Sequence, residues 1–78
     1  RIIILALFLS VAASAEDADV LKQANEMVNS GRYQQAIELL QETVSRHPDI
    51  YEAWYLLGKA QYLSGDTDSA EKSLLESA

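Results

Sequence analysis

The chain contains no cysteine, and its single histidine and single proline are the neighbours His47 and Pro48. Without cysteine no disulfide can stabilise the fold, and one histidine cannot make a metal site alone. Basic residues are also few, since six Lys and Arg stand against twelve Asp and Glu, giving a formal net charge of −6. This balance disfavours nucleic acid and anionic lipid as partners, because both attract clustered positive charge.

Catalytic and metal-binding patterns are missing as well. The sequence contains no glycine-rich phosphate loop and no nucleophile elbow, and its serines have no motif partner. Two acidic stretches, at residues 16–19 and 66–68, lack the alternating oxygen ligands and distal Glu of a calcium loop. We expect His47 to be a solvated residue in a turn rather than a general base or metal ligand. The sequence therefore predicts no catalytic residue, no metal site and no cofactor.

The amino terminus has the composition of a targeting segment. A basic start at Arg1 is followed by an apolar run over residues 2–9, then by small residues, and then by two acids. This order is typical of a secretory signal peptide. Ala13 and Ala15 are small enough for a signal peptidase, so we predict a signal peptide at residues 1–15 with its start truncated and cleavage after Ala15.

An uncleaved anchor or a buried core helix would be the alternatives for this segment. Neither accounts for small residues followed directly by acids. A helix over residues 2–15 would span roughly 21 Å, which is less than the ~30 Å hydrocarbon core of a bilayer. We therefore expect no stable membrane span after cleavage. Export together with the absence of cysteine favours the bacterial periplasm, with the extracellular space next.

The rest of the chain repeats itself with a period of 34 residues. Four pairs of positions correspond at this offset: Gly31 and Gly65, Ala36 and Ala70, Leu40 and Leu74, and Ala24 and Gly58. A fixed period of this length predicts stacked helical repeats, which form binding surfaces rather than active sites. We divide this part into a first repeat at residues 17–50 and an incomplete second repeat at residues 51–78.

Each repeat is expected to contain two helices. The first helix should cover about residues 18–30 and end at Gly31, because glycine adopts the left-handed conformation that terminates helices. The second should cover about residues 33–46 and end before Pro48, which has no amide donor. Loops of three to five residues make neighbouring helices antiparallel.

The second pair of helices has its own start and stop signals. We expect Asp49 to cap the third helix in a capping box with Glu52, three residues later. Gly65 should end this helix, and Asp66 should cap the fourth helix, which begins near residue 67. The fold class predicted from these signals is all-α.

At this point the second unit resembles a known family. Residues 53–62 read Ala-Trp-Tyr-Leu-Leu-Gly-Lys-Ala-Gln-Tyr, Gly65-Asp66 and Ala70 follow, and Pro48 closes the first unit. This order is similar to the tetratricopeptide repeat, and the resemblance implies a solenoid of antiparallel helix-turn-helix pairs over residues 17–78. Gln61 departs from the pattern, because the family usually places an aromatic ring there.

Most residues of the repeat signature are expected in the core. Ala24, Ala36, Gly58 and Ala70 are small where paired helices cross, which lets the backbones approach closely. Trp54 and Leu57, together with Leu74 and Leu75, should form the apolar faces between helices. The full signature consists of Ala24, Gly31, Ala36, Leu40, Pro48, Trp54, Leu57, Gly58, Gly65, Ala70 and Leu74.

A separate stripe of the third helix is the candidate binding surface, because the first helix of each pair lines the inner groove. Its residues follow a three, four, three spacing: Glu52, Tyr55, Lys59 and Tyr62. The matching stripe of the first helix is Ala18, Leu21, Asn25 and Val28, with Asn29 beside it. We predict a concave partner-binding face made of Asn25, Asn29, Glu52, Tyr55, Lys59 and Tyr62.

Tyr55 and Tyr62 offer broad contact area and a hydroxyl, so they could anchor a peptide or helix. Lys59 could meet a carboxylate, and Asn25 could bond a peptide backbone. The alternative for the tyrosines, given equal weight, is that they cover neighbouring repeats.

The resemblance implies an exported scaffold that binds another protein, with possible membership of a cell-envelope assembly complex. Because such stacks need ~3 repeats for stability, we expect the sequence to be the amino-terminal part of a longer protein. Two alternatives stay open: the non-catalytic portion of a larger exported enzyme, or a lumenal co-chaperone.

Overall fold

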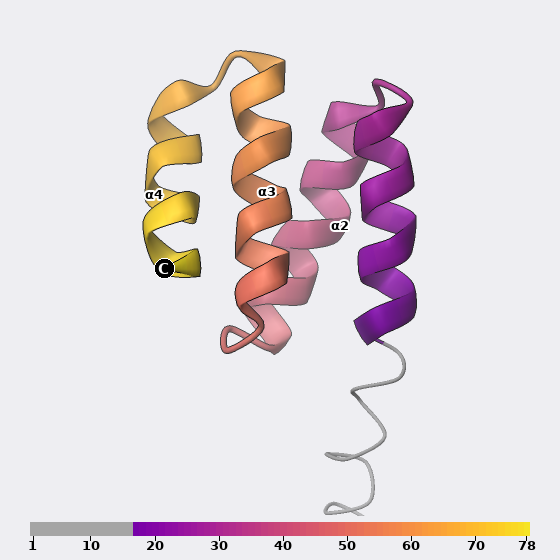
Figure 1. The fold of residues 1–78 in the computed structure, drawn as a ribbon, viewed down its shortest axis with the longest axis vertical. Coiled ribbons are helices and arrows are strands. Elements are labelled where there is room, and N and C mark those ends of the chain that lie inside the picture. The colour runs from indigo at the N-terminus through magenta and orange to yellow at the C-terminus, as the bar shows by residue number, and fades with distance from the viewer. Residues whose placement is uncertain (1–16) are drawn as a thin grey trace, which may run out of the picture.

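The computed structural model describes residues 17–78, and this part of the chain consists of helices joined by short turns (Figure 1). The first helix covers residues 17–29 and is the unlabelled indigo-to-purple helix. It is followed by α2 at Tyr33–Arg46, α3 at Tyr51–Ser64 and α4 at Thr67–Ser77. No strand occurs among these residues. The all-α prediction is therefore confirmed, whereas the predicted signal peptide with Ala13 and Ala15 lies outside the described residues.

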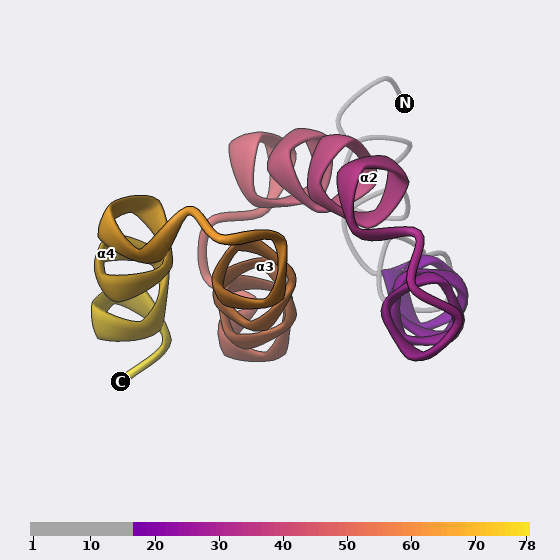
Figure 2. The same ribbon diagram turned by 90° about the horizontal axis from the view of Figure 1, so that it is seen from above.

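The four described helices form two pairs that stack side by side. The first helix pairs with α2, and α3 packs against both α2 and α4. Seen from above, the first helix and α3 lie on one side of the stack and α2 lies on the other (Figure 2). This is the arrangement of a helical solenoid, in which the first helix of each pair lines one face.

The turns within the two pairs have the same hydrogen bonds, 34 residues apart. Gly31 and Gly65 have φ values of +83° and +99°, the left-handed conformation that the sequence predicts for both. The N–H of Gly31 donates to Val28 at 3.1 Å and that of Gly65 donates to Tyr62 at 3.1 Å. In each turn, the N–H of the residue after the glycine donates to a carbonyl oxygen one residue earlier in the helix. Arg32 donates to Met27 at 2.8 Å, and Asp66 donates to Gln61 at 2.9 Å. Each glycine therefore closes a Schellman turn.

The start of α3 differs from the prediction. Ile50, and not Asp49, is the residue that precedes the helix, and no side chain caps it, so the predicted capping box with Glu52 is wrong. Ile50 packs against the core, and the indole N–H of Trp54 donates to the carbonyl oxygen of Pro48 at 2.8 Å. These contacts fix how the turn enters α3, and they leave Asp49 one residue too early to cap it. At α4 the predicted cap forms, since Asp66 accepts from the N–H of Ser69 at 3.3 Å.

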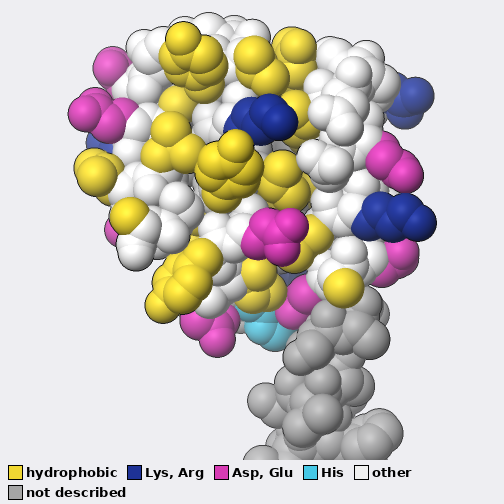
Figure 3. Space-filling model, in the orientation of Figure 1, with side chains coloured by type: hydrophobic (Ala, Val, Ile, Leu, Met, Phe, Trp, Pro, Cys, Tyr) yellow, Lys and Arg dark blue, Asp and Glu magenta, His cyan; other side chains and the backbone are white. Residues whose placement is uncertain are grey.

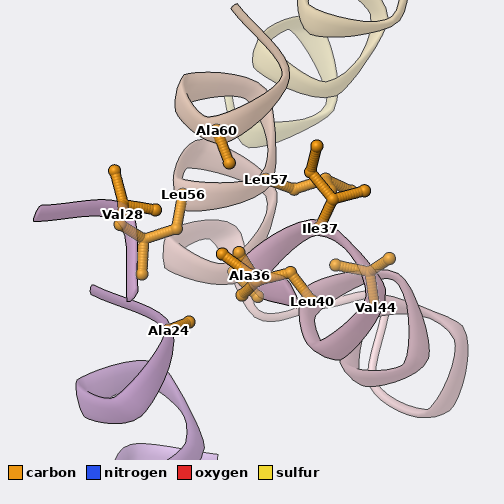
Figure 4. Packing of buried hydrophobic residues seen from close by; sticks show 10 residues of the cluster. Ala24, Val28, Ala36, Ile37, Leu40, Val44, Leu56, Leu57 and Ala60 are labelled. Atoms are coloured by element: carbon orange, nitrogen blue, oxygen red, sulfur yellow. The ribbon is translucent and has the colours of Figure 1, made fainter. Parts of the chain in front are cut away.

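The core lies where the first helix, α2 and α3 meet (Figure 4). Its buried apolar residues are Ala24, Val28, Ala36, Ile37, Leu40, Val44, Ala53, Leu56, Leu57 and Ala60. The sequence placed Val28 on the groove stripe, and this is wrong because only 3% of its surface is exposed. Val28 lies four residues after Ala24 and therefore on the same, inward face of the first helix.

Helix α4 is covered less well than α2. Leu74 is 38% exposed and Leu75 is 70% exposed, whereas Ala70 is buried. Leu74 therefore belongs only in part to the apolar face expected between the helices, and Leu75 is mostly in solvent. The reason is that, among α2, α3 and α4, helix α4 contacts α3 alone.

A buried polar pair joins α3 to α4. The hydroxyl of Ser73 donates to Oε1 of Gln61 at 2.7 Å, and both residues are at least nine-tenths buried. Gln61 occupies the position at which the resemblance leads one to expect an aromatic ring. The structure explains this departure, because the amide fills the space between the two helices and finds its donor on α4.

Replacing Ser73 with Ala should destabilise the fold by about 1–3 kcal/mol, because the buried oxygen of Gln61 then has no donor. The second change Gln61→Leu should restore most of this loss, since removing both polar groups together leaves nothing unsatisfied. Chemical denaturation followed by circular dichroism measures both variants. Ser30→Ala is the matched control, because that hydroxyl is exposed and bonds only within its own helix. Unchanged stability of the Ser73→Ala variant would contradict this role of the pair.

Candidate partner-binding face

The candidate site is the face formed by the first helix and α3, which is turned toward the viewer in Figure 1. Figure 3 shows the same face, where hydrophobic side chains gather over α3 and toward α4, with basic and acidic side chains among them. Helical geometry brings four of the predicted residues onto one stripe of α3: Glu52, Tyr55, Lys59 and Tyr62. We call this set the α3 stripe.

The two tyrosines of the α3 stripe are largely in solvent. Tyr55 is 51% exposed and Tyr62 is 62% exposed. On the inward side of the same helix, Leu56 and Leu57 are buried. At least half of each tyrosine therefore remains uncovered by the described repeats. Rings exposed to this extent can gain contact area when a partner binds.

Lys59 stands between these tyrosines, four residues after Tyr55 and three before Tyr62. The residue is half-buried, in contrast to Glu52, which is exposed. Within residues 17–78 no carboxylate oxygen lies within 4.0 Å of its ammonium group. The stripe therefore has a positive charge without a close counter-ion at its centre.

The first helix supplies the two asparagines of the predicted face. Asn25 and Asn29 are exposed, but neither makes a side-chain hydrogen bond to the described part of α3. Leu21 is half-buried and packs against the core. Together with Ala18 and Ile50 it lines a hollow of about 220 Å³ beside the turn that precedes α3. The two asparagines are thus free of side-chain hydrogen bonds to the described residues, and their role in binding stays a prediction.

The sequence gives no indication of a contact between Asp17 and His47. Nε2 of the histidine lies 3.8 Å from Oδ2 of the aspartate. His47 lies in a turn as expected, but its side chain is only 32% exposed, and Asp17 is 7% exposed, so the histidine is less solvated than the sequence predicts. The contact joins the start of the first helix to the turn between α2 and α3. It depends on how the first helix packs against α2, which no local pattern around either residue reports.

Metal sites and membrane-spanning helices each have structural requirements, which can be compared with the described residues. Among residues 17–78, no cluster of three or more His, Asp or Glu side chains is placed to hold a metal ion. Over the same residues, no helix is both long enough and apolar enough to cross a membrane.

The comparison with known families agrees with this geometry. The model of the tetratricopeptide repeat matches residues 21–78, which covers α2, α3, α4 and most of the first helix. No curated protein and no solved structure matches the chain.

Proposed function

Because the chain belongs to the tetratricopeptide-repeat family, we propose that it binds a peptide or helix of another protein on the face formed by the first helix and α3. Repeats of this family serve in protein–protein interaction and are typically non-catalytic. The observation that carries the proposal is the α3 stripe, with its two largely exposed tyrosines on either side of a half-buried lysine.

Physical chemistry favours such a stripe as a contact surface. Exposed aromatic side chains contribute little to folding, and clusters of them mark interaction sites more often than isolated apolar residues do. Tyrosine has few rotatable bonds, so ordering it on binding costs little entropy. The rigid helix α3 holds both rings at a fixed spacing, which preorganises the surface for a partner segment.

The site of action is part of the same proposal. We propose that the protein is exported, to the bacterial periplasm or otherwise to the extracellular space, and that it works as a scaffold in cell-envelope assembly. The support is the signal-like composition of residues 1–15 and the absence of cysteine. A role as the binding portion of a larger exported enzyme, or as a lumenal co-chaperone, would use the same face with a different partner.

Replacing Tyr55 and Tyr62 together with Ala should weaken partner binding by roughly 30-fold, because each aromatic anchor contributes about 1 kcal/mol or more. Helicity should not change, since both rings are mostly in solvent. The partner is first captured from source-cell extract on the immobilised chain and identified. Its dissociation constant is then measured by fluorescence anisotropy for each variant.

Leu75→Ala is the control for this experiment. Leu75 is an apolar side chain that is 70% exposed, but it lies on α4 rather than on α3. Its replacement should leave the dissociation constant nearly unchanged. Equal weakening by the Leu75 variant, or no weakening by the double variant, would contradict the proposed face.

A further inference from the structure

Lys59 differs from the other lysines and from Arg46 in its local surroundings. Lys22, Arg46 and Lys72 each have an acid three or four residues away on the helix surface. The residues at these distances from Lys59 are Tyr55, Leu56, Tyr62 and Leu63, and none carries a charge. The nearest acid of the α3 stripe is Glu52, seven residues away, or about 10.5 Å along the helix.

A partner bound on the α3 stripe must contact Lys59. A segment that covers both Tyr55 and Tyr62 must also cover the residue between them. Covering the ammonium of Lys59 removes its water, and a buried charge without a counter-ion is costly. A partner with an apolar or basic residue at this point is therefore rejected, whereas one with a carboxylate gains a charge-assisted hydrogen bond.

The spacing of the stripe also sets the pattern of the partner. Seven residues make nearly two helical turns, so Tyr55 and Tyr62 share one face. A helix packed along α3 meets these rings with two apolar residues about seven positions apart. The residue that faces Lys59 then lies three or four positions after the first of them.

Resting on the proposed function, we propose that the partner segment is a helix with an Asp or Glu placed between two apolar residues, and that this carboxylate pairs with Lys59. The site is a single-carboxylate recognition point on one helix. Its specificity comes from the charge at the centre, whereas its contact area comes from the two tyrosines. A basic partner residue facing Lys59 could not pair with Glu52 instead, because Glu52 lies seven residues away along α3.

The test uses the full chain and three alanine-rich helical peptides with two Leu residues seven positions apart. The peptides differ only at the position four after the first Leu, which is Glu, Gln or Lys. Fluorescence anisotropy should show the Glu peptide binding about tenfold tighter than the Gln peptide, with the Lys peptide weakest. The preference for Glu should shrink as salt is added.

Two variants of Lys59 and one control make the result specific. Lys59→Glu should reverse the order, so that the Lys peptide binds best, and Lys59→Gln should abolish the preference while circular dichroism stays unchanged. Lys72→Glu on α4 changes the net charge by the same amount and should keep the original order.

The outcomes separate this inference from the proposed function. If all three peptides bind equally, and binding is lost in the Tyr55→Ala and Tyr62→Ala chain, the contact face stands and the carboxylate preference is overturned. If Lys72→Glu changes the order as much as Lys59→Glu does, net charge rather than this site explains the preference. Failure of every peptide to bind at millimolar concentration contradicts both proposals.

Discussion

Replacement of Leu40 by Ala should lower the free energy of unfolding by about 2–5 kcal/mol, the largest loss expected from any single truncation in the described chain. Leu40 has no exposed surface, and Figure 4 shows it inside the cluster contributed by the first helix, α2 and α3. Truncation would remove a fully buried side chain and leave a cavity that three helices cannot easily close. In a core of this size, that loss is comparable with the whole folding free energy.

Leu74→Ala is the matched control, because Leu74 occupies the same position of the second unit, 34 residues later. It is 38% exposed, so its truncation removes less contact and leaves a gap that water can enter, at a cost of about 1 kcal/mol. Guanidinium denaturation of the full chain, followed by far-ultraviolet circular dichroism, measures both variants. Equal losses would mean that repeat position rather than burial determines the cost, against the packing described above.

This pair of leucines shows which part of the fold a repeated sequence can predict. Some features can be predicted from the sequence pattern itself: the 34-residue period, the glycines of the Schellman turns, and Pro48. The helix boundaries that depend only on these features could be predicted. Burial is not local. Leu40 and Leu74 have the same place in the pattern, but α2 is packed by helices on two sides and α4 contacts α3 alone among the labelled helices.

The errors at Val28 and Asp49, and the unforeseen contact of His47, also arise from tertiary packing. Helical spacing gives the residues that share a face, but several faces of the first helix are partly apolar, so spacing alone did not show that Val28 points inward. Asp49 fits a capping box by sequence, but the residue that precedes α3 is Ile50, which is partly buried against the core. The contact of His47 with Asp17 joins the start of the first helix to the turn after α2, and only the packing of these two helices brings the residues together.

The outline of the candidate site could be predicted because it depends on local helical spacing. The α3 stripe follows from the spacing of four residues on a single helix, and the structure places Tyr55 and Tyr62 in solvent as a binding surface requires. The half-burial of Lys59 and the distance of every described carboxylate from it depend on tertiary packing. The specificity proposed for the site could therefore be argued only from the structure.

Gly58 is the second position at which we expect a large effect. A Cβ atom built on it would lie 2.7 Å from Cγ and 2.8 Å from Cδ2 of Leu74, and 3.2 Å from the carbonyl oxygen of Ala70. Gly58→Leu should therefore destabilise the fold by about 1–3 kcal/mol, because the added side chain forces α3 and α4 apart. Denaturation of the full chain measures the loss.

The size of the effect at Gly58 should depend on Leu74, which gives a sharper test than either change alone. In the Leu74→Ala background the two closest contacts are gone, and only the oxygen of Ala70 at 3.2 Å still approaches the new atom. Gly58→Ala should then stabilise α3 by up to about 1 kcal/mol, because alanine favours the helix over glycine. With Leu74 present, the same change gains less, or loses stability, since the leucine must first rotate toward solvent. A double-mutant cycle therefore should show a coupling of at least about 0.5 kcal/mol, whereas additive effects would mean that Gly58 is small for a reason other than its contact with Leu74.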